Sequence, residues 1–344
     1  MSDIERNMET WGETGQFDPF DVIYSVVFQL IIRAAGAREI SDSVEKCKVL
    51  ERLYWRVEMG STPTSILFPW VPSTARKQKD AATREIYLMF DELVKARQSE
   101  GRREEDALQL LMDLGDSTPE IIALIMGVLF VAIVNTGLMA SWILIFLDQE
   151  PEWRDIVIQE VQTLLNRYAP APQNYGSISE RFSTIPLEAW ENEMPVLEVS
   201  MPSRDYPISI HYGAFASSRC IPLTFDDSSF LVYLAGETHS NPDIYPNPNK
   251  FDPSRYAAGQ DKSQTHAYLG WGAGRHPCLG KHFAQYKVKV ICALFFTVYN
   301  YEVVDASGRR PDPTVTVPDR NNIYQARPKD QTFYVKYSRR QELL

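Results

Sequence analysis

The sequence is poor in cysteine, in clustered basic residues and in repeats. Its 344 residues include four cysteines, which are too few and too scattered for a disulfide framework, and its first residues do not resemble a signal peptide. We therefore expect reduced, free thiols. No run of lysine and arginine exceeds two residues and the formal net charge is -10, so the chain lacks the basic footprint that a nucleic-acid partner requires. For a globular chain of this composition, we expect a small-molecule ligand.

One long stretch has no charged residue. Residues 121–147 carry none over 27 positions, and as a helix they would extend about 40 Å, enough to cross a bilayer. Two features argue against a membrane span. Thr118 is in position to cap the helix, with Pro119 at the first helical position, and polar side chains interrupt the middle of the stretch. A helix through the centre of a large domain is also apolar on all sides. We favour a buried internal helix and keep a transmembrane helix as the alternative.

The pattern along the chain changes near residue 206. Apolar residues recur at helical spacing over residues 21–35, 41–59, 75–99, 104–114 and 151–168. Short β-prone runs follow at residues 208–211, 230–234, 301–304 and 333–337. The sequence therefore predicts a mainly α fold with small β-sheets (α+β). We expect a single domain over residues 1–344, mostly helical in 1–206 and mixed in 207–344.

A cysteine in a glycine-rich loop is the clearest candidate site. In the sequence WGAGRHPCLG, residues 271–280, Cys278 lies between Gly274 and Gly280, immediately before a predicted helix. Glycines let backbone N–H groups approach the sulfur, and the helix places its positive end nearby, so both features stabilise a metal-ligating thiolate. The alternative is an inert buried cysteine beside turn glycines. Because this spacing, with an aromatic residue three positions before the first glycine, arises by chance in roughly one such chain in a thousand, we favour the functional interpretation.

These residues resemble the heme-binding loop of the cytochrome P-450 family. Upstream, Phe251, Pro253 and Arg255 in NPDIYPNPNKFDPSRY resemble the Phe-x-Pro-x-Arg element that precedes that loop in the family. The family usually begins the loop with phenylalanine, and Trp271 at that position is similar to the prostacyclin synthase branch. The resemblance covers the whole chain. It implies a cytochrome P-450 fold that lacks its N-terminal part, of the type found in fungal secondary metabolism.

The resemblance also implies a cofactor and the residues that hold it. Cys278 corresponds to the axial ligand of the iron in heme b, iron protoporphyrin IX. His276 corresponds to a donor to a heme propionate, and Arg219 is a second propionate candidate; the alternatives are a solvated loop histidine and a surface arginine. The other cofactor-binding candidates in the loop are Trp271, Gly274 and Gly280.

Two neighbouring polar residues on the charge-free stretch are the catalytic candidates. The family places an acid and then a threonine, after a glycine, on the helix over the distal heme face, where they deliver protons to bound oxygen. With Thr136 as the alcohol, Asn135 replaces the acid. With Asn135 at the alcohol position, the pattern resembles the sterol 7α-hydroxylase and prostacyclin synthase branches. We prefer the second register because Trp271 points to the same branch.

One element of the family pattern is missing. The family has a Glu-x-x-Arg pair that bonds the arginine corresponding to Arg255, and no such pair occurs between residues 188 and 230. The nearest positions are Asp205 and Ile208, in a segment that departs from the pattern as a whole. Arg255 would then lack part of its network, and a buried unpaired charge is costly. The chain also begins in a region that lies well inside full-length family members.

The resemblance implies an oxidoreductase. We expect a heme-thiolate monooxygenase that oxidises an apolar secondary metabolite (a terpenoid, sterol-like compound or polyketide), with O2 and electrons from an NADPH-dependent cytochrome P-450 reductase. The departures leave a second hypothesis, in which a degenerate relative acts as an isomerase or rearrangement catalyst, or binds without turnover. The family resemblance predicts the cytosolic face of the endoplasmic reticulum membrane, although this chain shows no N-terminal anchor.

Overall fold

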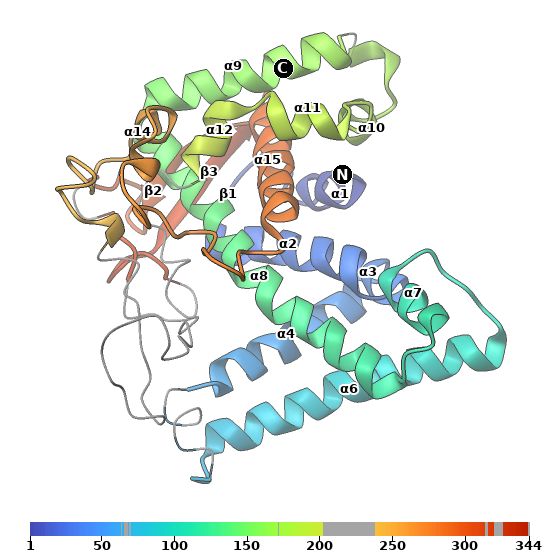
Figure 1. The fold of residues 1–344 in the computed structure, drawn as a ribbon. Helices are drawn as coiled ribbons and strands as arrows, with labels where there is room; N and C mark the ends of the chain where they lie inside the picture. Colours follow the sequence, from blue (N-terminus) through green and yellow to red (C-terminus); the bar gives the residue numbers. More distant parts are fainter. Residues whose placement is uncertain are drawn as a thin grey trace. The chain divides into compact units, whose positions relative to one another are not determined.

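The computed structural model describes residues 1–62, 64, 68, 70–170, 172–201, 238–313, 316–319 and 326–342 (Figure 1). The chain divides into two compact units: unit 1 contains residues 1–18 and 138–344, and unit 2 contains residues 19–137. The boundary between them falls inside one long helix, α8 (Thr118–Gln149), and not near residue 206, where the sequence pattern changes.

Unit 2 is built from helices. Its elements are α2 (Pro19–Ala35), α3 (Arg38–Ser41), α4 (Val44–Gly60), α6 (Thr74–Glu100), α7 (Ala107–Leu114) and the first part of α8. Helices α4, α6 and α7 begin at the capping side chains of Ser43, Ser73 and Asp106, each of which accepts a hydrogen bond from the backbone N–H three residues on. Helices α6 and α7 end at Gly101 and Gly115, whose left-handed φ angles of 62° and 84° favour glycine.

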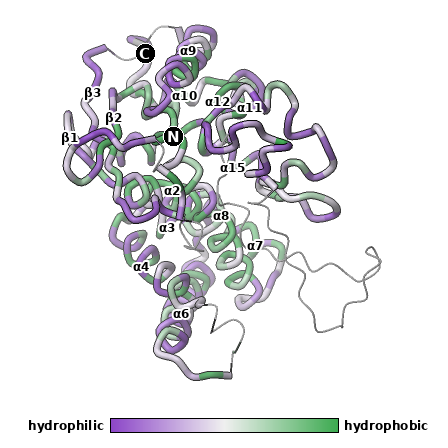
Figure 2. The backbone as a smooth tube through the Cα atoms, turned by 90° about the vertical axis from the view of Figure 1, so that its left-hand side faces the viewer, coloured by the Kyte–Doolittle hydropathy of each residue, from purple (hydrophilic) through white to green (hydrophobic). Residues whose placement is uncertain are grey.

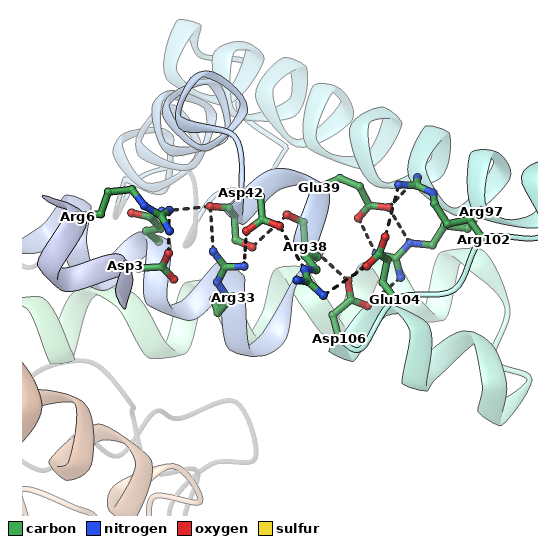
Figure 3. Close-up of polar contacts among 12 residues, drawn as sticks. Asp3, Arg6, Arg33, Arg38, Glu39, Asp42, Arg97, Arg102, Glu104 and Asp106 are labelled. Atoms are coloured by element: carbon green, nitrogen blue, oxygen red, sulfur yellow. Dashed lines mark hydrogen bonds and ion pairs between the residues drawn. The ribbon is translucent and has the colours of Figure 1, made fainter. Parts of the chain in front are cut away.

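The buried charges of unit 2 converge on Arg97 of α6 (Figure 3). Its side chain is fully buried, and its guanidinium donates to Glu39 of α3 at 2.6 Å and to Asp106, the cap of α7, at 2.8 Å. Burial raises the pKa of both carboxyls, but hydrogen bonds from Arg97 and neighbouring groups outweigh it, so each pKa is lowered. The cluster therefore holds α3, α6 and α7 together as charged groups.

Unit 1 combines helices with a small sheet. Its helices are α1 (Ser2–Glu9), α9 (Pro151–Tyr168), α10 (Ile178–Ser183), α11 (Leu187–Asn192), α12 (Pro195–Ser200), α14 (Ser254–Ala257) and α15 (Lys281–Val298), with short 3-10 helices at Pro172–Asn174 and Gln260–Lys262. The described strands β1 (Thr14–Phe17), β2 (Tyr299–Asp305) and β3 (Phe333–Arg339) form an antiparallel sheet in the order β1-β3-β2, in which Val335 pairs with both Phe17 and Val303. Helix α15 forms the core of the unit, since residues 287–298 are all buried.

The structure confirms the predicted mainly α fold with a small β-sheet. Helices predicted from residues 21, 75 and 151 begin within two residues of those positions. The helix predicted from residue 41 begins at Val44, because Ser43 caps it. Strand β1 was missed, since four residues carry little pattern and their partner, β3, lies at the other end of the chain. The strands predicted at 208–211 and 230–234 lie outside the described residues.

Helix α8 has the apolar composition that the sequence suggested (Figure 2). Its cap is Ser117 and not Thr118: the N–H and hydroxyl of Ser117 donate to Glu120 at 3.0 and 2.6 Å, and the N–H of Ile121 donates to the Ser117 carbonyl. Among the described helices, α8 is the one long and apolar enough to cross a membrane. Within unit 1, however, its residues 138–147 are buried, so protein contacts account for their apolar character, as for an internal helix.

Candidate functional site

Residues 268–280, here called the cysteine loop, form a tight turn that leads directly into α15. The N–H of Cys278 donates to the carbonyl of Trp271 at 2.7 Å, which closes the loop, and the N–H of Gly272 donates to Leu269 at 2.9 Å. At the other end, the loop is continuous with the first turn of α15, because the N–H of Ala284 donates to the carbonyl of Gly280 at 2.8 Å. The position of Cys278 is therefore tied to that of the helix.

The glycines of the cysteine loop differ in the physical reason why glycine occupies each position. Gly272 and Gly274 adopt φ angles of 75° and 73°, the left-handed region that favours glycine. Gly280 has an ordinary φ of -90°, and a Cβ there would meet no other part of the described chain within 4 Å. Sequence reasoning missed Gly270, where a Cβ would overlap the ring of Tyr268. The predicted role of Gly274 thus has a conformational basis, whereas the chain itself places no constraint on Gly280.

Cys278 differs from the other described cysteines in its exposure. Cys47 and Cys292 are buried, and burial raises the pKa of the Cys292 thiol to about 12, which keeps that thiol protonated. Cys278 is exposed, and beside it Leu279 is fully exposed and Phe283 is 44% exposed. An accessible soft thiol flanked by uncovered apolar side chains fits a flat, apolar cofactor whose metal takes a thiolate ligand.

The other ligands of such a metal would come from the cofactor. Among the described residues, no group of three or more His, Cys, Asp or Glu side chains could hold a metal ion by itself. One thiolate is sufficient where a porphyrin supplies the equatorial nitrogens. The residues present therefore fit heme better than a protein-only metal centre.

The structure brings five predicted site residues into one loop. Trp271, Gly274, His276, Cys278 and Gly280 all belong to the cysteine loop; Trp271 is half-buried and His276 is exposed. The sixth candidate, Arg219, belongs to the segment from residue 202 to residue 237, which lies outside the described residues. The propionate roles of His276 and of that arginine stay predictions.

The two distal candidates lie on the part of α8 that belongs to unit 2. Thr136 is 2% exposed, and its hydroxyl donates to the carbonyl of Ala132 on the same helix at 2.9 Å. Asn135 is half-buried, and its side chain makes no hydrogen bond with any residue that the structure describes. The side chain of Asn135 is thus available for another partner, while the hydroxyl of Thr136 is committed to its own helix.

A histidine that sequence reasoning missed supports the cysteine loop. The Nε2 atom of His239 accepts a hydrogen bond from the N–H of Leu269 at 2.9 Å, and its ring stacks on Tyr268 with centroids 5.0 Å apart. His239 is 30 residues before Leu269, so no local spacing links the two. The start of the cysteine loop is therefore fixed by a side chain from a distant segment.

Arg255 is buried with an incomplete set of partners. It is 5% exposed, and its guanidinium donates to the carbonyl oxygens of Asn247 and Lys250 at 3.2 and 3.1 Å. Its Nε is buried and has no hydrogen-bond partner among the described residues. Asp205 and Ile208, the nearest positions to a Glu-x-x-Arg pair, lie outside those residues.

Comparisons with known proteins agree with this geometry. The family model described as cytochrome P-450 matches residues 229–325, which include Arg255 and the cysteine loop. The chain is 26% identical to the cytochrome P-450 monooxygenase AacuE of Aspergillus aculeatus over 86% of this chain and 61% of the relative. It is 23% identical to obtusifoliol 14-alpha demethylase of Triticum aestivum over 88% of this chain and 68% of the relative.

Solved structures show the same fold. The retinoic acid-bound cyanobacterial protein CYP120A1 matches with a TM-score of 0.66 at 20% identity, over 98% of this chain and 73% of that one. At this identity the match supports the fold and not a shared substrate. The chain spans about three fifths of the length of AacuE.

Proposed function

Because the chain belongs to the cytochrome P-450 family, whose members are heme b oxidoreductases, we propose that it is a heme-thiolate monooxygenase with Cys278 as the axial ligand. The observation that carries the proposal is the exposed Cys278 thiol beside the uncovered apolar side chains of Leu279 and Phe283. A flat apolar ligand bound at the thiol would cover these two side chains and remove their apolar surface from water.

The residues of the chain have distinct parts in this proposal. When bound, heme supplies the chemistry that activates oxygen, and the thiolate raises electron density on its iron. The hydrogen bond from the Cys278 N–H to Trp271 and the left-handed glycines fix the sulfur in place. Asn135 is the distal polar residue, because its side chain is uncommitted whereas the hydroxyl of Thr136 is bonded to Ala132.

The proposed substrate class draws on the relatives, and the proposed electron donor on the family resemblance. A fungal monooxygenase and a plant sterol demethylase are among them, which supports an apolar secondary metabolite of terpenoid, sterol-like or polyketide type. Electrons would come from an NADPH-dependent reductase, and the protein would act at the cytosolic face of the endoplasmic reticulum. The buried residues 138–147 support α8 as an internal helix and not as a membrane anchor.

A second candidate function is supported by the Nε of Arg255, which is buried and has no hydrogen-bond partner in the part of the chain that the structure describes. If that region holds heme poorly, the chain would be a degenerate relative that rearranges or binds its ligand without reductase-dependent oxidation.

Reconstitution separates the two functions. The protein, supplied with heme, a fungal reductase and NADPH, is incubated with a panel of terpenoids, sterols and polyketides under isotopically labelled O2. Incorporation of one labelled oxygen atom into a product supports the monooxygenase. Heme binding with no NADPH-dependent incorporation contradicts it and supports the degenerate relative.

A further inference from the structure

A buried ammonium ties three helices of unit 1 together. Lys289 on α15 has a side chain that is 2% exposed. Its Nζ donates to the carbonyl oxygens of Trp190 and Glu191 on α11, at 3.0 Å each, and to Oε2 of Glu198 on α12 at 2.8 Å. An ammonium has three N–H donors, and all three are used here. The buried charge is therefore compensated, and α11, α12 and α15 meet at one atom.

Glu198 also holds a second turn of α15. Its other oxygen, Oε1, accepts a hydrogen bond from the side-chain amide of Gln285 at 3.4 Å. Gln285 precedes Lys289 by four residues, so both side chains leave α15 from the same face on consecutive turns. The Glu198 carboxylate thus contacts α15 at two points. These two contacts restrict both the rotation of α15 about its axis and its movement along that axis.

The helix that carries this carboxylate is itself fixed. Glu160 on α9 accepts hydrogen bonds from the N–H groups of Val196 and Leu197, in the first turn of α12, at 2.6 and 2.9 Å. These are two of the N–H groups that a helix start leaves without intrahelical partners. Glu160 therefore fixes the position of Glu198 relative to α9. Through Glu198, the position of α15 is fixed relative to α9 as well.

Placement of α15 also places Cys278. The helix begins at Lys281, and the N–H of Ala284 donates to Gly280 within the cysteine loop. Gln285 lies about one turn after Lys281, and the N–H of Lys281 donates to the carbonyl of Cys278 at 3.4 Å. Because one helical turn is stiff and these hydrogen bonds join it to the cysteine loop, a shift at Gln285 is transmitted to Cys278.

A second buried lysine on the same helix provides the contrast. Lys287 is 5% exposed and has no acidic partner among the described residues; its Nζ lies 4.4 Å from the ring centroid of Phe283. Burial lowers its pKa to about 7. Two positions along a helix turn a side chain by about 200°, so Lys287 does not share the face of Lys289. Burial of a lysine on α15 is therefore not sufficient to make a contact between helices.

We propose that Glu198 and Lys289 are positioning residues for the Cys278 thiolate: their ion pair, with Gln285, sets the placement of α15 and so the approach of the sulfur to the heme iron. The inference rests on the proposed heme ligation by Cys278. It assigns the function of holding the thiolate to a pair between two helices that are far apart in the sequence.

Four variants test the inference in the full chain. Lys289→Met removes the ammonium and keeps the length of the apolar stem, Lys289→Arg keeps a cation, and Glu198→Gln keeps the shape of the carboxylate. Lys287→Met is the matched control, because it removes a buried amine two residues away for which the described part of the chain provides no ion pair. Heme content, the fraction of the reduced carbon monoxide complex with a thiolate-type spectrum, and the unfolding midpoint are measured for each.

Lys289→Met is expected to lower the thiolate-ligated fraction about 10-fold, the lower end of the effect of losing an outer-shell partner. Glu198→Gln should lower it less, Lys289→Arg should retain most of it, and Lys287→Met should leave it unchanged. An unchanged thiolate fraction in Lys289→Met, or an equal loss in Lys287→Met, would overturn the inference. If Lys289→Met does not fold, the thiolate fraction of Glu198→Gln decides.

Cys278→Ser separates this inference from the proposed function. If Cys278→Ser keeps the parent spectrum, heme ligation by Cys278 is wrong and both claims fail. If Cys278→Ser loses the thiolate spectrum while Lys289→Met and Glu198→Gln keep it, the ion pair is structural only, and the proposed function stands.

Discussion

Two buried arginines, Arg97 in unit 2 and Arg255 in unit 1, have different kinds of partner. In unit 2, the guanidinium of Arg97 contacts two carboxylates, those of Glu39 and Asp106. In unit 1, Arg255 is also buried, but among the described residues its guanidinium donates only to two backbone carbonyl oxygens, and its Nε has no partner there. Carboxylates compensate a buried cation, whereas carbonyl dipoles do so only in part. Unit 2 therefore depends strongly on one ion cluster, while the region around Arg255 has little stabilisation to lose.

The largest expected effect is at Arg97. Arg97→Met should lower the free energy of unfolding by about 3–5 kcal/mol, because it removes the cation that pairs with the buried Asp106 carboxylate and leaves Glu39 with Arg102 alone among the described cations. Denaturant unfolding measures the change. The matched control is Lys95→Met on the same helix, whose ion pair with Asp91 is exposed on the lysine side, so this variant should unfold at nearly the same denaturant concentration as the parent. Equal losses in the two variants would show that burial does not set the strength of these pairs.

A pH titration of stability extends the comparison to Lys287. Burial lowers the pKa of Lys287 to about 7 from an ordinary value near 10.5. Between these values the unfolded chain binds a proton that the folded protein does not, so the free energy of unfolding should rise with pH from 7 upward, by up to about 1.4 kcal/mol per pH unit. The difference between the parent and Lys287→Met isolates this slope. A constant difference from pH 7 to pH 9 would contradict the lowered pKa.

A smaller effect is expected at Arg255. Arg255→Met removes two hydrogen bonds to neutral carbonyl groups, so it should cost about 1–3 kcal/mol, less than Arg97→Met. Parallel denaturant titrations of the two variants rank them. A loss at Arg255 as large as that at Arg97 would mean that Arg255 has an acidic partner beyond the described residues.

The smallest expected effect separates two neighbouring residues on α8. Asn135→Ala should reduce turnover, or the affinity for a heme ligand, about 10-fold, since the side chain of Asn135 is uncommitted. Thr136→Ala should change these quantities less, because the Thr136 hydroxyl bonds to its own helix. Rates measured side by side for the two variants test this order. The reverse order would select the register in which Thr136 is the catalytic alcohol.

Local patterns predicted much of the fold and the centre of the site. Helical periodicity marked α2, α6 and α9, and the glycines around Cys278 marked a loop whose φ angles at Gly272 and Gly274 do require glycine. These features depend on residues close together in the sequence. The sequence was therefore sufficient to find them.

What the sequence could not predict depends on distant partners. Strand β1 exists because β3 pairs with it, His239 supports Leu269 from 30 residues away, and Lys289 meets Glu198 from another helix. Lys289 has three acceptors and Lys287 has no acidic partner among the residues that the structure describes, yet the sequence alone does not distinguish these two lysines. Only the fold shows which one is compensated.

The reduced carbon monoxide spectrum of the purified, heme-supplied protein, recorded beside that of Cys278→Ser, tests heme ligation by Cys278 more directly than any other measurement. We expect a thiolate-type spectrum in the parent, its loss in Cys278→Ser, and its retention in Cys47→Ser, where the replaced thiol is buried and remote in the sequence. A parent protein that binds no heme, or a Cys278→Ser variant with the parent spectrum, would contradict the assignment of Cys278 as the ligand.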